Sequence, residues 1–250
     1  MKPPEPRLLP VDTETGVVLL PCIVRRVRGS RHLRVVVEPD RKVHLRIPYH
    51  TAEREALEFL RKQGDWVVRT LAKTPAPLRI HEYLRKHPRL SADGQWWDLR
   101  IQVTAQSTQQ GWRFVDEPRG VEFLLPQENL AEEGTYFGAY LRSFAKLSLP
   151  HRLHRLARER GVPFPKRVTV RDQRSRWGSC STSGTISLNW RLVLLAPALQ
   201  DYILLHELAH IRHPDHSAGF WRHLQELDPA AMAHDREIQK IGTRLISLGV

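Results

Sequence analysis

The prediction for this chain starts from one stretch, Leu204-Leu205-His206-Glu207-Leu208-Ala209-His210-Ile211. In a helix, positions four apart lie on the same face, so His206 and His210 can present imidazole nitrogens to one metal ion. Zinc binds such nitrogens at about 2.0–2.1 Å. Glu207 follows the first histidine and points beside the ion, where it can hold and deprotonate a water molecule. The spacing therefore predicts a zinc-dependent hydrolase with Glu207 as general base.

The surrounding residues predict a buried helix over 197–212. Pro197 suits its first turn, and apolar side chains such as Tyr202 and Leu205 can bury its remaining sides. A buried helix rarely carries two histidines and a glutamate unless these polar groups have partners. The alternative is a core helix whose histidines are satisfied by hydrogen bonds, and the context favours the metal.

A catalytic zinc needs a third protein ligand and an open fourth position. Pro214 ends the helix, because a residue before proline is pushed away from the helical region. A second helix is expected to start near Ser217, which places His216 at the corner as the favoured third ligand. Cys180, on an upstream strand, is the competing ligand. His213 lies one residue off the metal face and is better placed to touch substrate.

Two strand-like runs precede this helix, at 168–171 and 185–190, with a turn at Ser183-Gly184. The segment between them supplies candidate substrate-binding residues, namely Arg176, Trp177, Gly178 and Ser179. An edge strand there would offer backbone groups to an extended peptide. A simple bend with Gly178 as a bulge explains the same residues equally well.

The N-terminal part alternates like a sheet protein. Runs at 17–20, 22–27, 33–37 and 43–47, with Gly29-Ser30 and Pro39-Asp40 between them, predict a small antiparallel sheet. A helix is expected from Thr51 to about Ala72, with Gly64 inside it. Further strands are expected at 96–103, 112–115 and 121–125.

A change of composition near 126–134 gives the predicted domain boundary. We expect a loose segment at 1–15, a β-rich region with a helix at 16–130, and a separate domain at 135–250. A long helix is predicted over 135–160, which Pro150 must start, kink or divide. No internal repeat is visible. The predicted fold class is α+β.

Bulk properties exclude several classes of protein. Hydrophobic residues make up 41% and charged residues 26%, which argues against disorder of the whole chain. Two cysteines do not form a disulfide framework, and no secretory signal or membrane-spanning run is visible, so a cytoplasmic location is expected. The net charge of +12 fits a nucleic-acid or acidic partner and a solvated basic surface equally well.

Four short motifs follow one another between residues 176 and 221. They are Arg176-Trp177-Gly178-Ser179-Cys180-Ser181, Ser187-Leu188-Asn189-Trp190-Arg191-Leu192, His206-Glu207-Leu208-Ala209-His210, and His216-Ser217 with Phe220-Trp221. This set resembles the YgjP-like predicted metal-dependent hydrolases, relatives of the SprT and WLM metallopeptidases. The close resemblance covers 167–224, and 25–66 is similar more loosely. It implies a zincin-like metallopeptidase domain with a short sheet and several helices, in which His216 rather than Cys180 completes the metal site and Glu207 is catalytic.

The resulting hypothesis is a zinc metallopeptidase that hydrolyses peptide bonds of a peptide or protein substrate. Three alternatives stay open. A basic nucleic-acid-binding protein could use the zinc structurally, and a DNA-associated protease would combine the two activities. A deformylase-like hydrolase would use Cys180 as ligand. The pattern does not set the oligomeric state.

Overall fold

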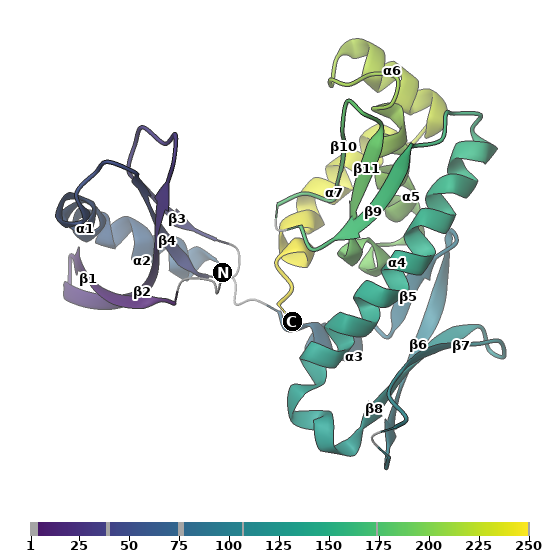
Figure 1. Cartoon of the computed structure of the whole chain (residues 1–250), viewed down its shortest axis with the longest axis horizontal. Helices are drawn as coiled ribbons and strands as arrows, with labels where there is room; N and C mark the ends of the chain where they lie inside the picture. Colours follow the sequence, from purple (N-terminus) through teal and green to yellow (C-terminus); the bar gives the residue numbers. More distant parts are fainter. Residues whose placement is uncertain (1–4, 39–40, 75–77, 107, 174, 250) are drawn as a thin grey trace. The chain divides into compact units, whose positions relative to one another are not determined.

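The computed structural model describes residues 5–38, 41–74, 78–106, 108–173 and 175–249, with the backbone alone at Thr243. The chain divides into two compact units, residues 1–77 and 78–250, and each is described by itself (Figure 1). Within the described residues, no helix is long and apolar enough to cross a membrane.

Unit 1 contains a four-stranded mixed sheet. Its strands are β1 (Arg7–Thr13), β2 (Gly16–Val27), β3 (Arg34–Val37) and β4 (Val43–Pro48), in the order β1-β2-β4-β3. The runs predicted at 17–20 and 22–27 form the single strand β2, and those at 33–37 and 43–47 correspond to β3 and β4. The antiparallel prediction is wrong for the central pair, because β2 and β4 run parallel. The reason is that β3 lies outside β4, at the sheet edge, instead of between β2 and β4.

The segment predicted to be loose, 1–15, contains strand β1. Residues 1–4 lie outside the described part, but Leu9 and Val11 of β1 are buried in the core of unit 1, where they join Leu45 of β4 and Leu60. Apolar residues at 9 and 11 have the two-residue period of a β-strand, but the neighbouring prolines obscured this pattern.

The single helix predicted from Thr51 to Ala72 is two helices, α1 (Glu53–Lys62) and α2 (Gly64–Lys73). Gly64 lies so close to β1 that an added Cβ would be 2.0 Å from the carbonyl oxygen of Asp12. The glycine therefore permits a close approach of α2 to the strand.

Unit 2 begins with α3 (Ile80–Lys86) and a second four-stranded sheet. Its strands are β5 (Arg89–Ala92), β6 (Gln95–Thr104), β7 (Gly111–Val115) and β8 (Gly120–Pro126). The strands predicted at 96–103, 112–115 and 121–125 are confirmed as β6, β7 and β8. The order β5-β6-β8-β7, with its parallel central pair, repeats the topology of unit 1, although the sequence shows no repeat.

A third, three-stranded sheet lies on the other side of a long helix (Figure 1). It contains β9 (Arg167–Arg171), β10 (Gly178–Cys180) and β11 (Thr185–Asn189), with β10 at an edge. Turn η2 (Trp190–Leu194) leads into α5 (Pro197–Ala209), which is followed by α6 (Ala218–Leu227) and α7 (Ala231–Ile246).

The long helix is α4 (Glu133–Glu159), which follows the short η1 (Gln127–Glu132) and continues through Pro150. It contacts β8 on one side and β9 and α5 on another. Phe123 of β8 packs against Phe137 of α4 with the rings tilted and their centroids 5.7 Å apart. These contacts join 78–250 into one core, so the observed division lies after residue 77 instead of the predicted 130–135. The α+β class is confirmed.

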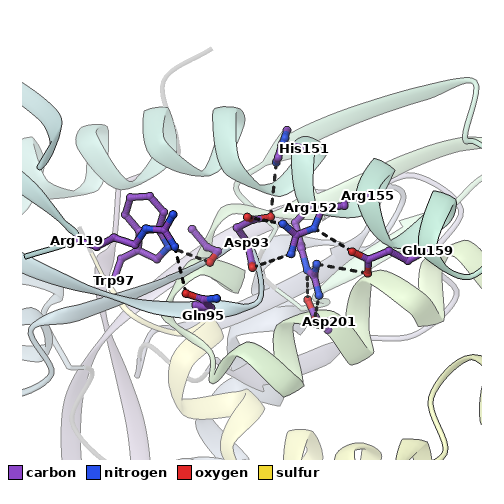
Figure 2. Close-up of polar contacts among 10 residues, drawn as sticks. Asp93, Gln95, Trp97, Arg119, His151, Arg152, Arg155, Glu159 and Asp201 are labelled. Carbon is purple, nitrogen blue, oxygen red and sulfur yellow. Dashed lines mark hydrogen bonds and ion pairs between the residues drawn. The ribbon is translucent and has the colours of Figure 1, made fainter. Parts of the chain in front are cut away.

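A network of ion pairs ties α4 to α5 and to the β5–β6 turn (Figure 2). Arg152 of α4 is buried and donates from Nε to Oδ1 of Asp201 on α5 at 2.8 Å. Arg155, one turn further along α4, pairs with Asp93 in the β5–β6 turn. The Arg152 side chain is 9% exposed and that of Arg155 is 37% exposed, so the two pairs differ mainly in burial.

We predict that Asp201→Ala lowers the free energy of unfolding by about 3 kcal/mol, because it leaves the buried Arg152 guanidinium without its main partner. Urea denaturation followed by circular dichroism measures this change. Arg155→Ala is the matched control, expected to cost about 1 kcal/mol or less because its pair is solvent-screened. Equal losses in the two variants would contradict the argument.

Candidate metal centre

Helix α5 supplies most of the site. Most of its residues are buried, and the helix begins with Pro197, whose missing N–H costs nothing in the first turn. The helix ends at Ala209, three residues before the predicted end. The reason is that Ile211 and Arg212 donate to the carbonyls of Leu208 and Ala209, the tighter three-residue spacing of a closing turn.

Three histidines meet at one point. His206 lies on α5, His210 is the C-cap that follows its last residue, and His216 lies in the loop before α6. One nitrogen from each lies within 4.8 Å of the other two, and the Nε2 atoms of His206 and His216 are 3.1 Å apart. Tetrahedral zinc with nitrogens at about 2.0–2.1 Å would separate its ligand atoms by about 3.3 Å.

The surroundings of His206 and His210 keep these two rings neutral. Burial, with the neighbouring His210 and His216, lowers the pKa of His206 to about 3, and burial also lowers the pKa of His210. Nδ1 of His210 is 3.0 Å from the carbonyl oxygen of His213. A carbonyl only accepts, so Nδ1 carries the proton and Nε2 has a free lone pair. A metal ligand must be neutral imidazole, and these rings meet that condition.

Phe220 of α6 forms the floor beneath the three rings. Its ring stacks on His210 at 4.5 Å and meets His206 and His216 edge-on at 4.9 and 4.8 Å between centroids. Asp215 accepts from the backbone N–H of Ser217, which shapes the loop that carries His216. Helix α6 and the loop before it therefore position His216.

Glu207 is buried beside this cluster. Burial raises the pKa of its carboxyl group to about 8, and the positive charge of Arg176 opposes that shift. Its Oε2 atom is buried with no hydrogen-bond partner among the described residues, and Nδ1 of His206 is in the same condition. The unpartnered oxygen of Glu207 is costly, and such an atom is expected where a ligand or water completes the site. The Nδ1 atom of His206 is not the nitrogen that faces the other histidines, since Nε2 does so.

Gly178 of β10 lies directly against Glu207. An added Cβ would lie 2.4 Å from Oε1 of Glu207 and 2.7 Å from its Cδ and Cγ atoms. The strand therefore approaches the carboxylate as closely as a backbone can. Buried Asn189 holds the segment before β10, because its side chain donates to the carbonyls of Gln173 and Arg176.

Comparison with known proteins now decides the family. The model of the YgjP-like metallopeptidase domain matches residues 31–240, most of the chain. The chain belongs to the YgjP-like family. Membership makes it a metallopeptidase by family and confirms the predicted class of enzyme. The match includes every residue of the cluster described above.

Two further comparisons add little. No curated protein matches the chain. A solved structure, the metallopeptidase zymogen abylysin of Pyrococcus abyssi, is 29% identical, with 38% of this chain and 95% of that chain covered, at a TM-score of 0.34. This TM-score is too low to support an argument about the fold.

The remaining predicted residues of this YgjP-like chain lie in different settings. Arg176 is exposed near Glu207, whereas Trp177 is buried, with its Nε1 only 3.1 Å from a Cβ added at Gly242 of α7. Ser179 lies in edge strand β10. The structure does not group Cys180 with the histidines, and burial and the charge of Glu207 raise its pKa. His213 contributes its carbonyl, while its ring lies near His223.

The sequence did not predict that Asn189 anchors the segment before β10, nor that Tyr202 and Asp235 form a hydrogen bond near His206. Tyr202 lies one turn before His206, with ring centroids 6.0 Å apart, and donates from its hydroxyl to Asp235 at 2.9 Å. Asn189 carries a local signal, because asparagine is favoured where a helical turn begins and its side chain accepts from the N–H of Arg191. The approach of Asp235 from α7 has no local signal.

We predict that Gly178→Ala lowers peptide hydrolysis by about 100-fold while the metal content stays unchanged, since the new methyl group displaces the Glu207 carboxylate and leaves the histidines in place. Turnover of a quenched fluorescent peptide and elemental analysis measure the two quantities. Gly219→Ala is the matched control, because its added Cβ meets His213 at an ordinary 3.5 Å. Unchanged turnover in Gly178→Ala would refute the close contact with Glu207.

Proposed function

We propose that this chain is a zinc-dependent metallopeptidase in which His206, His210 and His216 hold the metal and Glu207 is the general base. One observation carries the proposal. Three imidazoles converge on one point, and the residue beside the first of them, Glu207, has a buried carboxyl group with an unpartnered oxygen. Three nitrogen ligands with room for a fourth partner are typical of a catalytic zinc site.

The donor set supports zinc as the metal. All three ligand atoms are imidazole nitrogens, which zinc and several other transition ions accept. The second nitrogen of His210 is held by a backbone carbonyl, as is usual for metal-binding histidines. A bound zinc ion would polarise the substrate carbonyl and lower the pKa of a water molecule at the open position.

Glu207 would take the proton from the attacking water and pass it to the leaving amine. The raised pKa of its carboxyl group suits this role, because a group that must accept and then release a proton works best with a pKa near the working pH. A divalent cation beside the carboxylate would lower that pKa again. Arg176, whose charge acts on Glu207, is the candidate for stabilising negative charge on the substrate.

Strand β10 is the proposed platform for the substrate. It lies at the sheet edge, and it pairs on its other side with β11. An extended peptide can add to an exposed strand through backbone hydrogen bonds. Gly178 of that strand contacts Glu207, so a peptide paired there would pass close to the general base.

The alternatives have less support. A structural zinc is normally closed by four protein ligands, whereas the described residues group three. A deformylase-like site would need Cys180 among the ligands, whereas the group of possible ligands among the described residues contains His206, His210 and His216. Recruitment to DNA through the basic surface rests only on the net charge of +12.

We predict that Glu207→Gln retains zinc and loses hydrolysis by a factor of about 10²–10⁴, because the amide keeps the shape and cannot accept the proton. The measurement is turnover of a quenched fluorescent peptide at saturating zinc. Glu226→Gln, an exposed change on α6, is the control that should leave turnover unchanged. Equal turnover in wild type and Glu207→Gln would remove Glu207 from the mechanism.

We predict that His216→Ala loses bound zinc, whereas His213→Ala and Cys180→Ala retain it. The imidazole of His216 is the proposed ligand, but His213 acts through its backbone carbonyl, which alanine also has. Elemental analysis of the purified proteins gives the stoichiometry. Zinc retained in His216→Ala and lost in Cys180→Ala would assign the third ligand to the thiolate.

A further inference from the structure

Unit 2 contains a cavity of about 390 Å³ that the metal centre does not use. It is lined from α3 and the turn after it, the β5–β6 hairpin, the start of α5, and α7. Pro197 begins α5, and His206 lies nine residues further along, which corresponds to about 14 Å of helix. A ligand in this cavity would therefore be separate from the zinc ligands.

The floor of the cavity is apolar. Leu194 and Leu195, at the end of η2, and Leu199 of α5 lie under it, and Leu245 of α7 closes one side; all four are buried. Two half-buried aromatic rings, Tyr83 and Trp96, stand at the wall. Such a floor suits one apolar side chain of a ligand.

The rim of the cavity is basic. Lys86, Arg89, Lys240 and Arg244 are exposed at its edge, and Glu237 is the single carboxylate among its lining residues. Within the part of the chain that the structure describes, no carboxylate lies within ion-pair distance of these four cations. Several cations around one apolar floor attract a ligand with several negative charges.

The cations converge on one place. The Arg89 guanidinium lies over the Trp96 ring, 4.3 Å from its centroid. Burial raises the pKa of the Tyr83 hydroxyl, and the charges of Arg89 and Arg244 both oppose that shift. Two arginines from different elements, β5 and α7, therefore act on the same side of the cavity.

We propose that this cavity binds an acidic segment of a protein substrate, with one apolar side chain on the leucine floor and flanking carboxylates at the basic rim. The binding of the segment stands on the cavity itself, and its assignment to a substrate rests on the proposed peptidase function. An inorganic anion would leave the apolar floor unused, and a neutral peptide would leave four cations uncompensated. The site holds the substrate apart from the bond that is cut, which raises its effective concentration at the zinc.

The test is fluorescence anisotropy with the full-length Glu207→Gln variant, which binds without cutting. The probe is a short labelled peptide with one leucine between two pairs of aspartates. The double variant Lys240→Gln/Arg244→Gln is expected to bind it about tenfold more weakly, and Glu237→Gln about twofold more tightly. Replacing the probe's leucine by alanine should also weaken binding, because the floor loses its occupant.

The matched control removes the same charge elsewhere. Helix α2 presents Arg69 and Lys73 beside the exposed Trp66, so Arg69→Gln/Lys73→Gln changes the net charge equally in unit 1. This control should bind the probe as the parent does. Equal weakening of probe binding in both double variants would overturn the proposal, and so would no binding of the probe at all. Tighter binding of single-stranded DNA than of the peptide by the Glu237→Gln variant would also overturn it. Self-association lost in the cavity variant would assign the site to a second copy instead and also overturn it.

The readout separates this inference from the proposed function. Probe binding uses a variant that does not need to hydrolyse anything, so a failure of peptide hydrolysis in the wild type leaves the binding result standing. Conversely, a protein that does not bind the probe at the cavity would leave the predicted loss of hydrolysis in Glu207→Gln unchanged. Two failures would therefore be two independent results.

Discussion

The burial of ionisable side chains on one helix is the constraint on which this structure depends. Helix α5 carries Glu207, which is buried, and His206 and Asp201, which are partly buried, and each needs a partner to be stable there. Asp201 finds its partner in Arg152 of α4, which fixes the helix against the long spine of the unit. Oε2 of Glu207 keeps no partner among the described residues, and the Nε2 atom of His206 faces Nε2 of His216 instead of a structural partner. The fold thus pairs the charge of Asp201 and leaves the Glu207 side chain without a protein partner for Oε2.

The elements around α5 serve this arrangement from three sides. Phe220 of α6 supports the imidazoles from below, β10 presses its glycine against the carboxylate, and α7 packs on Trp177 behind that glycine. The sheet β9–β11 matters because it holds β10 at this position, and Asn189 ties the preceding segment to it. The geometry of a few atoms around Glu207 thus depends on strands, helices and turns spread over about 80 residues, from Arg167 to Ile246.

Sequence patterns predicted those parts of the structure that depend on residues close together in the chain. The four-residue spacing of His206 and His210 puts both rings on one helix face, and Pro214 shows that the helix must end before His216, so the three histidines could be predicted from the sequence. The strands β6, β8 and β11 were also predicted, because their apolar alternation is clear. By contrast, β1 was hidden by prolines, and α3 and β5 are too short for a periodic signal.

Long-range features escaped prediction for a common reason. The parallel pairing of β2 with β4, and of β6 with β8, depends on which strand lies outside, which no short pattern records. The β5–β8 sheet and helix α5 belong to one unit because α4 contacts both of them. The composition change near 126–134 therefore did not predict the boundary. The approach of Gly178 to Glu207 is likewise a tertiary contact.

The central claim is that three imidazoles, and no thiolate, bind the metal. X-ray absorption at the zinc edge of the purified protein tests it most directly. The account predicts a first shell of nitrogen and oxygen atoms at about 2.0–2.1 Å, with the outer-shell scattering of three imidazole rings. A sulfur atom at about 2.3 Å in that shell would contradict it and assign a ligand to cysteine.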